Sequence, residues 1–159
     1  IECLNGYRLK EKCPDNLESF TVPLGRPEVL VEGSDITLVT YGSCVRVAME
    51  ALAMVEEHGV SVELIDVQTL LPFDLEHVIG HSLRKTNNIL FLDEDVPGGG
   101  TAYMMQQVLD LQDGYYFLDQ KPRCLSAKAH RPAYGSDGDY FSKPNSAEIA
   151  GVILEMTGK

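Results

Sequence analysis

The sequence predicts an α/β protein with three layers, α/β/α, in which helices cover a mostly parallel five-stranded sheet and one antiparallel edge strand spans Glu28 to Val31. Two observations predict this class. Short apolar runs rich in β-branched residues alternate with longer runs whose apolar residues recur every three or four positions. Turn-forming glycines, prolines and aspartates separate the runs. Strands that alternate with helices form right-handed βαβ units, and these build a parallel sheet between helical layers.

The first elements of the main domain follow one another from residue 28. The segment EVLVEG at 28–33 predicts a short strand that ends in a turn. The run ITLVTYG at 36–42 is continuously apolar and β-branched, which is typical of a strand covered on both faces. Ser43 is expected to cap the next helix, which ends at Gly59. The expected buried stripe of this helix is Val45, Ala48, Leu52 and Val55.

The same alternation continues in the second half of the chain. A strand is expected at Val62 to Val67, and Asp74 is the expected cap of a helix with Leu75, Val78, Ile79 and Leu83 as its buried stripe. The run NILFLDED predicts a strand that ends in acids. The remaining expected elements are a helix around 102–112 closed by Asp113 and Gly114, a weaker strand at Arg123 to Ala129, and a final helix at Ala147 to Met156 opened by Pro144, Asn145 and Ser146.

Length, composition and charge fit a single acidic globular domain. The chain has 159 residues, is 44% hydrophobic, and carries 13 Lys and Arg against 24 Asp and Glu, which gives a formal net charge of −11. No run of about 18 apolar residues is present, so no membrane-spanning helix is expected. Affinity for a phosphate backbone depends on clustered Lys and Arg, so nucleic-acid binding is not expected either.

The first 27 residues differ from the rest, because they contain three prolines and no sustained periodicity. We expect 1–27 to be the tail of a preceding domain plus a linker, and 28–159 to be the main domain. The start IECLNG, without an initiator Met or a signal-like segment, predicts a piece of a longer chain. The cysteines show no zinc-ligand spacing, so we expect structural thiols in a reducing compartment: Cys3, Cys13, Cys44 and Cys124.

The glycine segment PGGGT at 97–101 is the first candidate site, since glycines between a strand and a helix can present backbone N–H groups to a phosphate. A GxGxxG motif would need a glycine at position 103, where Tyr103 stands, and the segment has no P-loop lysine. The acids Asp93 to Asp95 would also repel an anion. We therefore interpret the glycines as a tight turn and the acids as a solvated turn at the carboxyl end of a strand.

Three further side chains are weaker candidates. His77 and His81 are four positions apart and share a helix face, but Val78 stands where a zinc-binding HExxH motif needs glutamate. We interpret them as an exposed pair. Cys44 follows a strand at a helix start, where the helix dipole lowers a thiol pKa. Without a recognisable catalytic partner, we interpret it as a buried small residue.

The segment AHRPAYGSDGDYFSKPN at 129–145 is predicted to be a 17-residue loop, which is too long for a plain connection. Two aspartates flank Gly138 and suggest calcium, but the other acids of an EF-hand loop are missing, so no metal site is expected. The loop is instead the candidate for contacts with a partner or another domain. The residues proposed for those contacts are His130, Arg131, Tyr134, Asp137, Asp139, Tyr140 and Phe141.

Four segments together resemble one family: Pro23–Gly25, Ile36–Ser43, Ile65–Asp74 and Lys85–Gly100. The combination resembles the C-terminal domain of the β-type half of thiamine-diphosphate-dependent 2-oxo acid dehydrogenases, the decarboxylating first component. The resemblance covers nearly the whole chain. The segments HRPAYGSDGDYFSKPN and YYFLD are most similar to bacterial enzymes that fuse the α-type and β-type halves, which favours a branched-chain substrate such as 2-oxoisovalerate.

The resemblance implies that the chemistry lies in other domains. In this family thiamine diphosphate and Mg²⁺ are held between the other two domains, which also supply the catalytic His and Glu. No catalytic, cofactor-binding or metal residue is therefore expected in this chain, and the chain alone is expected to be inactive. Its implied role is to associate subunits in a homo-oligomeric parent enzyme and to dock the lipoyl acyltransferase component. An acidic surface suits docking, because that component's subunit-binding module is typically basic.

Three alternatives stay open from sequence. The first is the same domain of a pyruvate dehydrogenase β half. The second is a transketolase-type or deoxyxylulose-phosphate-synthase-type enzyme, which shares this architecture. The third is a free-standing α/β module that binds a nucleotide at the PGGG loop. The expected location is the cytoplasm in a bacterium or the mitochondrial matrix in a eukaryote.

Overall fold

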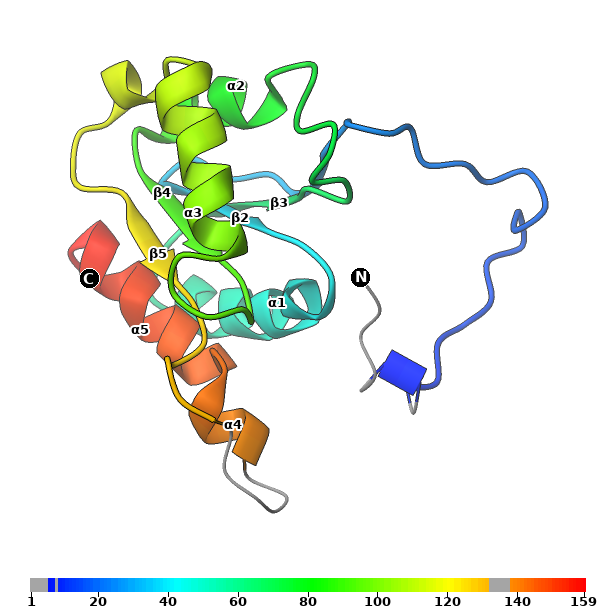
Figure 1. Ribbon diagram of the computed structural model, residues 1–159. Helices are drawn as coiled ribbons and strands as arrows, with labels where there is room; N and C mark the ends of the chain where they lie inside the picture. The colour runs from blue at the N-terminus through cyan, green and yellow to red at the C-terminus, as the bar shows by residue number, and fades with distance from the viewer. Residues whose placement is uncertain (1–5, 8, 132–137) are drawn as a thin grey trace.

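Figure 1 shows the protein as a computed structural model, which describes residues 6–7, 9–131 and 138–159. Five strands form one sheet in the order β1-β3-β2-β4-β5. The edge strand β1 runs antiparallel to β3, and the remaining neighbours are parallel, which confirms the predicted sheet. The strands are β1 (Glu28–Val31), β2 (Ile36–Thr40), β3 (Val62–Asp66), β4 (Ile89–Leu92) and β5 (Arg123–Leu125).

Helices cover both faces of the sheet, so the predicted three-layer class is confirmed (Figure 1). Helices α1 (Ser43–Glu56) and α5 (Ser146–Thr157) pack on one face. The other face is covered by α2 (Val78–Thr86) and α3 (Gly100–Met105), with α3 continuing into the π-helical η2 (Gln106–Leu111). The short elements are the 3₁₀ helix η3 (Gly114–Phe117) and α4 (Gly138–Ser142).

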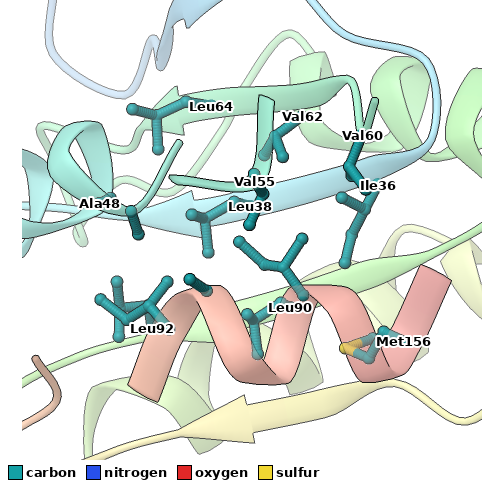
Figure 2. Close-up of a cluster of buried hydrophobic side chains, with 14 of the residues drawn as sticks. Ile36, Leu38, Ala48, Val55, Val60, Val62, Leu64, Leu90, Leu92 and Met156 are labelled. Atoms are coloured by element: carbon teal, nitrogen blue, oxygen red, sulfur yellow. The ribbon is translucent and has the colours of Figure 1, made fainter. Parts of the chain in front are cut away.

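The hydrophobic core lies on both faces of the central strands. All residues of β2 and β4 are buried, as the continuous apolar runs predict. Figure 2 shows the cluster on one face, where Leu38 and Leu90 of the sheet meet Val55 of α1 and Met156 of α5. Burying such a side chain fully stabilises the fold by roughly 1.5–3 kcal/mol.

The start of α1 differs from the prediction. Gly42, with φ of 62°, occupies the cap position, and no side chain accepts a hydrogen bond there, so Ser43 is the first helical residue and not a cap. A positive φ is readily adopted by glycine, which explains the shift. The buried stripe is accordingly Cys44, Ala48, Ala51 and Val55, with Val45 and Leu52 only partly buried.

His77 occupies the cap position of α2, so Asp74 is not the cap residue, but its side chain still accepts hydrogen bonds from the first amides of the helix. Its carboxylate accepts hydrogen bonds from the amides of Val78 at 2.8 Å and Ile79 at 3.0 Å. A turn closed by the His77 amide and the Asp74 carbonyl precedes the helix. Leu75 therefore lies outside α2 and is 64% exposed, so its place in the buried stripe was wrong.

The remaining elements agree with the prediction in kind and differ in length. The helix expected at 102–112 begins at Gly100, and Asp113 follows it with a positive φ of 59°. The last strand is only three residues long. The Asn145 side chain caps α5 by accepting from the Glu148 amide at 2.9 Å, as the Pro-Asn-Ser signal indicates.

Residues 9–27 take an extended path outside the sheet and form a wide arc beside the body (Figure 1). An ion pair between Glu11 and Arg46 of α1 joins this arc to the domain. At its end, the Leu75 amide donates to the Gly25 carbonyl at 2.8 Å. None of the helices in the described part of the chain has the length and apolar character needed to cross a bilayer.

Candidate functional site

The carboxyl edge of the parallel strands is the first place to look for a site, because open α/β sheets bind ligands where successive strands turn in opposite directions. Here β3 and β4 lie on opposite sides of β2, so the switch point falls between the loops that follow β2 and β4. Tyr41 follows β2 and Asp93 follows β4. The predicted PGGG loop also begins at this edge.

Tyr41 and Asp93 form a closed pair at the switch point. The Tyr41 hydroxyl donates to Asp93 Oδ2 at 2.8 Å, and Asp93 Oδ1 accepts from the Glu94 amide at 2.7 Å. Burial and the neighbouring Asp93 carboxylate raise the pKa of Tyr41. Both oxygens of this buried carboxylate are therefore used within the chain, which gives Asp93 a structural role.

The glycine loop packs against acids and does not fit a diphosphate. A Cβ built on Gly99 would lie 2.2 Å from an Asp95 carboxylate oxygen, and one on Gly100 would lie 2.4 Å from an Asp93 carboxylate oxygen. These glycines thus give room to carboxylates, which would repel a phosphate at the same place. The geometry supports the interpretation as a strand-to-helix turn. Within residues 6–7, 9–131 and 138–159 no cluster of three or more His, Cys, Asp or Glu forms a metal site.

Cys44 is poorly suited to be a nucleophile. Its side chain is 4% exposed at the start of α1. Burial, with the nearby Glu94 and Asp93, raises the pKa of its thiol to about 12. The raised pKa, caused mainly by burial, means that the thiolate that a nucleophile needs is scarce at neutral pH.

We expect Cys44 to resist alkylation in the folded protein. At pH about 8, iodoacetamide should modify the exposed Cys13 while Cys44 reacts only after unfolding in urea, because the reagent requires a thiolate. Mass spectrometry of proteolytic peptides measures each site separately. Rapid modification of Cys44 in the folded chain would restore it as a candidate nucleophile.

The structure places the two histidines and part of the long loop on the surface. His77 and His81 are both exposed, as interpreted from sequence. His130 and Arg131 are exposed as well, and His130 Nδ1 contacts the Arg131 carbonyl at 2.8 Å. Tyr134, Asp137 and the side chain of Asp139 lie outside the described residues.

Tyr140 and Phe141 lie on α4, a helix that the loop prediction missed. Their rings are 5.3 Å apart in an edge-to-face arrangement, and both side chains are more than half exposed. The exposed pair agrees with the expected contact role, which stays a prediction. Of the seven predicted contact residues, His130 and Arg131 precede residue 132, Asp139, Tyr140 and Phe141 lie on α4, and Tyr134 and Asp137 lie outside the described residues.

A second exposed aromatic surface was missed by the sequence analysis. We call it the tyrosine surface: Leu111, Tyr115 and Tyr116, flanked by the exposed acids Asp110, Asp113 and Asp119. Tyr115 is 69% exposed and Tyr116 is 79% exposed, with ring centroids 6.0 Å apart. The 3₁₀ helix η3 turns both rings outward. The signal was present in YYFLD, where two tyrosines directly follow a helix end.

Fold and site together define an α/β domain of the doubly wound class whose carboxyl edge is filled by its own acids and glycines. The chain belongs to the family described as transketolase, C-terminal domain, which matches residues 25–142.

Two β subunits from other organisms are similar in sequence to most of this chain. It is 33% identical over 143 residues to a pyruvate dehydrogenase E1 component subunit beta of Mesostigma viride, which covers 90% of the chain and 42% of the relative. It is 32% identical to the acetoin:2,6-dichlorophenolindophenol oxidoreductase subunit beta of Bacillus subtilis, over 100% of the chain and 45% of the relative. The chain thus spans less than half the length of these relatives.

Solved structures share the fold. A split-gene transketolase, described as an inactive beta4 tetramer, has a TM-score of 0.69 at 21% identity and covers 88% of this chain and 44% of its own. A transketolase from Pichia stipitis has a TM-score of 0.61 at 16% identity, covering 84% of this chain and 18% of its own. At these identities the likeness establishes the fold.

Proposed function

We propose that this chain is the C-terminal domain of the β-type subunit of a 2-oxo acid dehydrogenase, and that it associates subunits and docks a partner component. The observation that carries the proposal is the similarity to two β subunits over 90% and 100% of the chain. The parent enzyme would decarboxylate a 2-oxo acid on thiamine diphosphate and acylate a lipoyl group. In such an enzyme the cofactor carries the carbanion chemistry and the protein positions it.

The substrate is the part of the expectation that the relatives change. The names of these relatives refer to pyruvate and acetoin. We therefore favour the pyruvate-type alternative over 2-oxoisovalerate. For location, we propose the cytoplasm if the protein is bacterial. If it is eukaryotic, the chloroplast is an alternative to the expected mitochondrial matrix, because the relatives from rice and Arabidopsis thaliana are chloroplast proteins.

Thiamine diphosphate and Mg²⁺ are proposed to bind to other parts of the parent enzyme. The glycines at 99 and 100 face the carboxylates of Asp95 and Asp93, so the loop that follows β4 is a poor diphosphate site. The same packing argues against a free-standing nucleotide-binding module. The proposed contribution of this domain is therefore association and docking rather than catalysis.

The tyrosine surface is our proposed docking surface for the basic subunit-binding module of the lipoyl acyltransferase. Exposed tyrosines combine a large apolar area with a polar tip and are enriched among the residues that contribute most to interfaces. The surrounding Asp110, Asp113 and Asp119 have no ion pair within the described part of the chain. Nearby, the Arg84 guanidinium already lies 4.7 Å from the Phe117 ring centroid, so this region holds a cation in an aromatic setting.

Replacing Tyr116 with alanine is expected to weaken binding of the basic subunit-binding module about tenfold or more, since a central exposed aromatic residue would lose its contact area. Titration calorimetry with the 159-residue chain measures the affinity. Tyr140→Ala is the matched control, because Tyr140 is also exposed and also paired with a second ring. A loss confined to Tyr140→Ala would place docking on the long loop, and no measurable binding by the unaltered chain would contradict the docking proposal.

A further inference from the structure

Helices α1 and α5 form a groove on the outer side of the layer that covers the sheet. They pack against each other on the same face of the sheet (Figure 1). A hollow of about 440 Å³ lies between them. Its walls and floor are mostly small or apolar: Ala53, Met54, Ala147, Ala150, Gly151 and Leu154. Glu57 and His58 complete the lining at the end of α1.

The groove borders the core that these helices form with the sheet, since Ala150 lies in that core and Leu154 packs against it, but the other groove residues face outward. The core stripe of α1 contains Ala48 and Val55, whereas Ala53 and Met54 face outward and are exposed. On α5, Ile153 is buried while Ala147 and Gly151 are exposed. On α5, the groove residues Ala147, Ala150, Gly151 and Leu154 recur at spacings of three and four residues, which is the pattern that receives another helix, and α1 adds Ala53 and Met54.

Gly151 points to an external occupant. A glycine in the middle of a helix is destabilising relative to alanine. A Cβ at this position would meet nothing within 4 Å, so the internal packing of the chain gives no reason for a glycine. A helix lying in the groove would give one, because small residues at a crossing let two helix backbones approach to the short end of their usual separation of about 8–10 Å.

Exposed acids beside the groove indicate that the helix it binds is basic. Glu57 lines the groove, Glu50 lies one turn before Ala53 on α1, and Glu148 lies one turn before Gly151 on α5. All three acids are exposed and unpaired within the described part of the chain. Lys or Arg beside an apolar stripe would match them, whereas a second copy of this chain would bring like charges together across the interface.

We propose that the groove between α1 and α5 docks a basic amphipathic helix of another polypeptide. The helix places small and medium apolar side chains over Ala53, Ala150 and Gly151 and directs Lys or Arg to the acids of the rim. Exposed Met54 suits such a role, because methionine adapts its shape to different partners. The inference is independent of the docking proposed for the tyrosine surface, which lies on η2 and η3.

The test uses the full 159-residue chain and a fluorescein-labelled helical peptide of roughly 20 residues. The peptide has Leu and Ala at i, i+3, i+4 and i+7 and Lys at the flanking positions, and fluorescence anisotropy measures its binding. The unaltered chain should bind it saturably, and Gly151→Leu should weaken binding about tenfold by filling the groove. Ala102→Leu, at an exposed alanine of α3, is the matched control and should leave the affinity unchanged.

Several outcomes would overturn the proposal. These are absence of binding, equal binding to Gly151→Leu, and equal binding of a peptide in which Glu replaces every Lys. Sedimentation showing a dimer of the chain that Gly151→Leu abolishes would assign the groove to a second copy instead. Circular dichroism shows whether each variant is folded. If Gly151→Leu does not fold, Ala53→Leu replaces it in the test, because it fills the groove from α1.

Discussion

Replacing Lys85 with methionine is expected to destabilise the fold by about 3 kcal/mol at neutral pH. The Glu63 carboxylate in β3 is only 3% exposed, and the Lys85 ammonium forms an ion pair with it. Removing the cation leaves a buried carboxylate without its charge partner, which typically costs roughly 3–5 kcal/mol. Lys85 is itself nearly half exposed, so water can partly replace it and the lower end of that range is expected.

The variant should also reverse the pH dependence that Glu63 contributes. Burial opposes ionisation of Glu63, but hydrogen bonds from Lys85 and from the Gly33 amide outweigh it and hold the pKa below its ordinary value. Its contribution to stability is therefore present above the ordinary glutamate pKa of about 4.3 and is lost as pH falls through the lower, folded value. Without Lys85, burial dominates and raises the pKa. The folded variant then holds a proton more tightly than the unfolded chain, so its stability falls as pH rises.

Urea unfolding at neutral pH and at pH about 4 measures both effects. The difference in unfolding free energy between the unaltered chain and Lys85→Met should be larger at neutral pH than at pH about 4. Adding Glu63→Gln to Lys85→Met should recover part of the loss, because a neutral amide is cheaper to bury than a carboxylate. An equal loss at both pH values, or no recovery in the double variant, would show that Lys85 acts through packing and not through Glu63.

The layers of the fold could be predicted because its strands are covered on both faces. Such strands read as continuous runs with few or no charged residues, and Ile36–Thr40 and Ile89–Leu92, both buried throughout, are the clearest examples. The start of α1 was mistaken because Ser43 has the chemistry of a cap, while the positive φ of Gly42 decides where the helix begins. A local preference for a side-chain cap was overridden by the backbone of the strand-to-helix turn.

Surfaces were harder to predict than the core because exposure depends on contacts between distant segments. Leu75 fits an apolar helix stripe in sequence, yet it lies in the turn before α2 and its amide bonds to the Gly25 carbonyl. The tyrosine surface had a sequence signal in YYFLD, whereas the groove beside Gly151 follows no recognisable motif, since it is created by two helices that are distant in sequence. The acidic net charge of the chain predicts a basic partner, but it does not indicate which surface of the domain would bind that partner.

Replacing Gly33 with alanine is expected to destabilise the fold by about 3 kcal/mol, because the new Cβ has no space. Built on this glycine, a Cβ would lie 2.2 Å from the Glu63 amide nitrogen and 2.2 Å from the Val62 carbonyl carbon. Both are backbone atoms at the start of β3, so no side chain can rotate away, and overpacking of this kind typically costs roughly 1–3 kcal/mol or more.

Relieving that contact would require the turn between β1 and β2 to move away from β3. The Gly33 amide would then lose its bond to Glu63 Oε2 at 3.2 Å, and the Asp35 amide its bond to the Ser61 carbonyl at 2.9 Å. Gly151→Ala is the matched control, since its Cβ enters open space and should stabilise the helix by roughly 0.5–1 kcal/mol. Urea unfolding should therefore give shifts of opposite sign for the two glycines. A Gly33→Ala midpoint equal to that of the unaltered chain would mean that the β1–β2 turn can move without loss, and that its bonds to β3 contribute little to the fold.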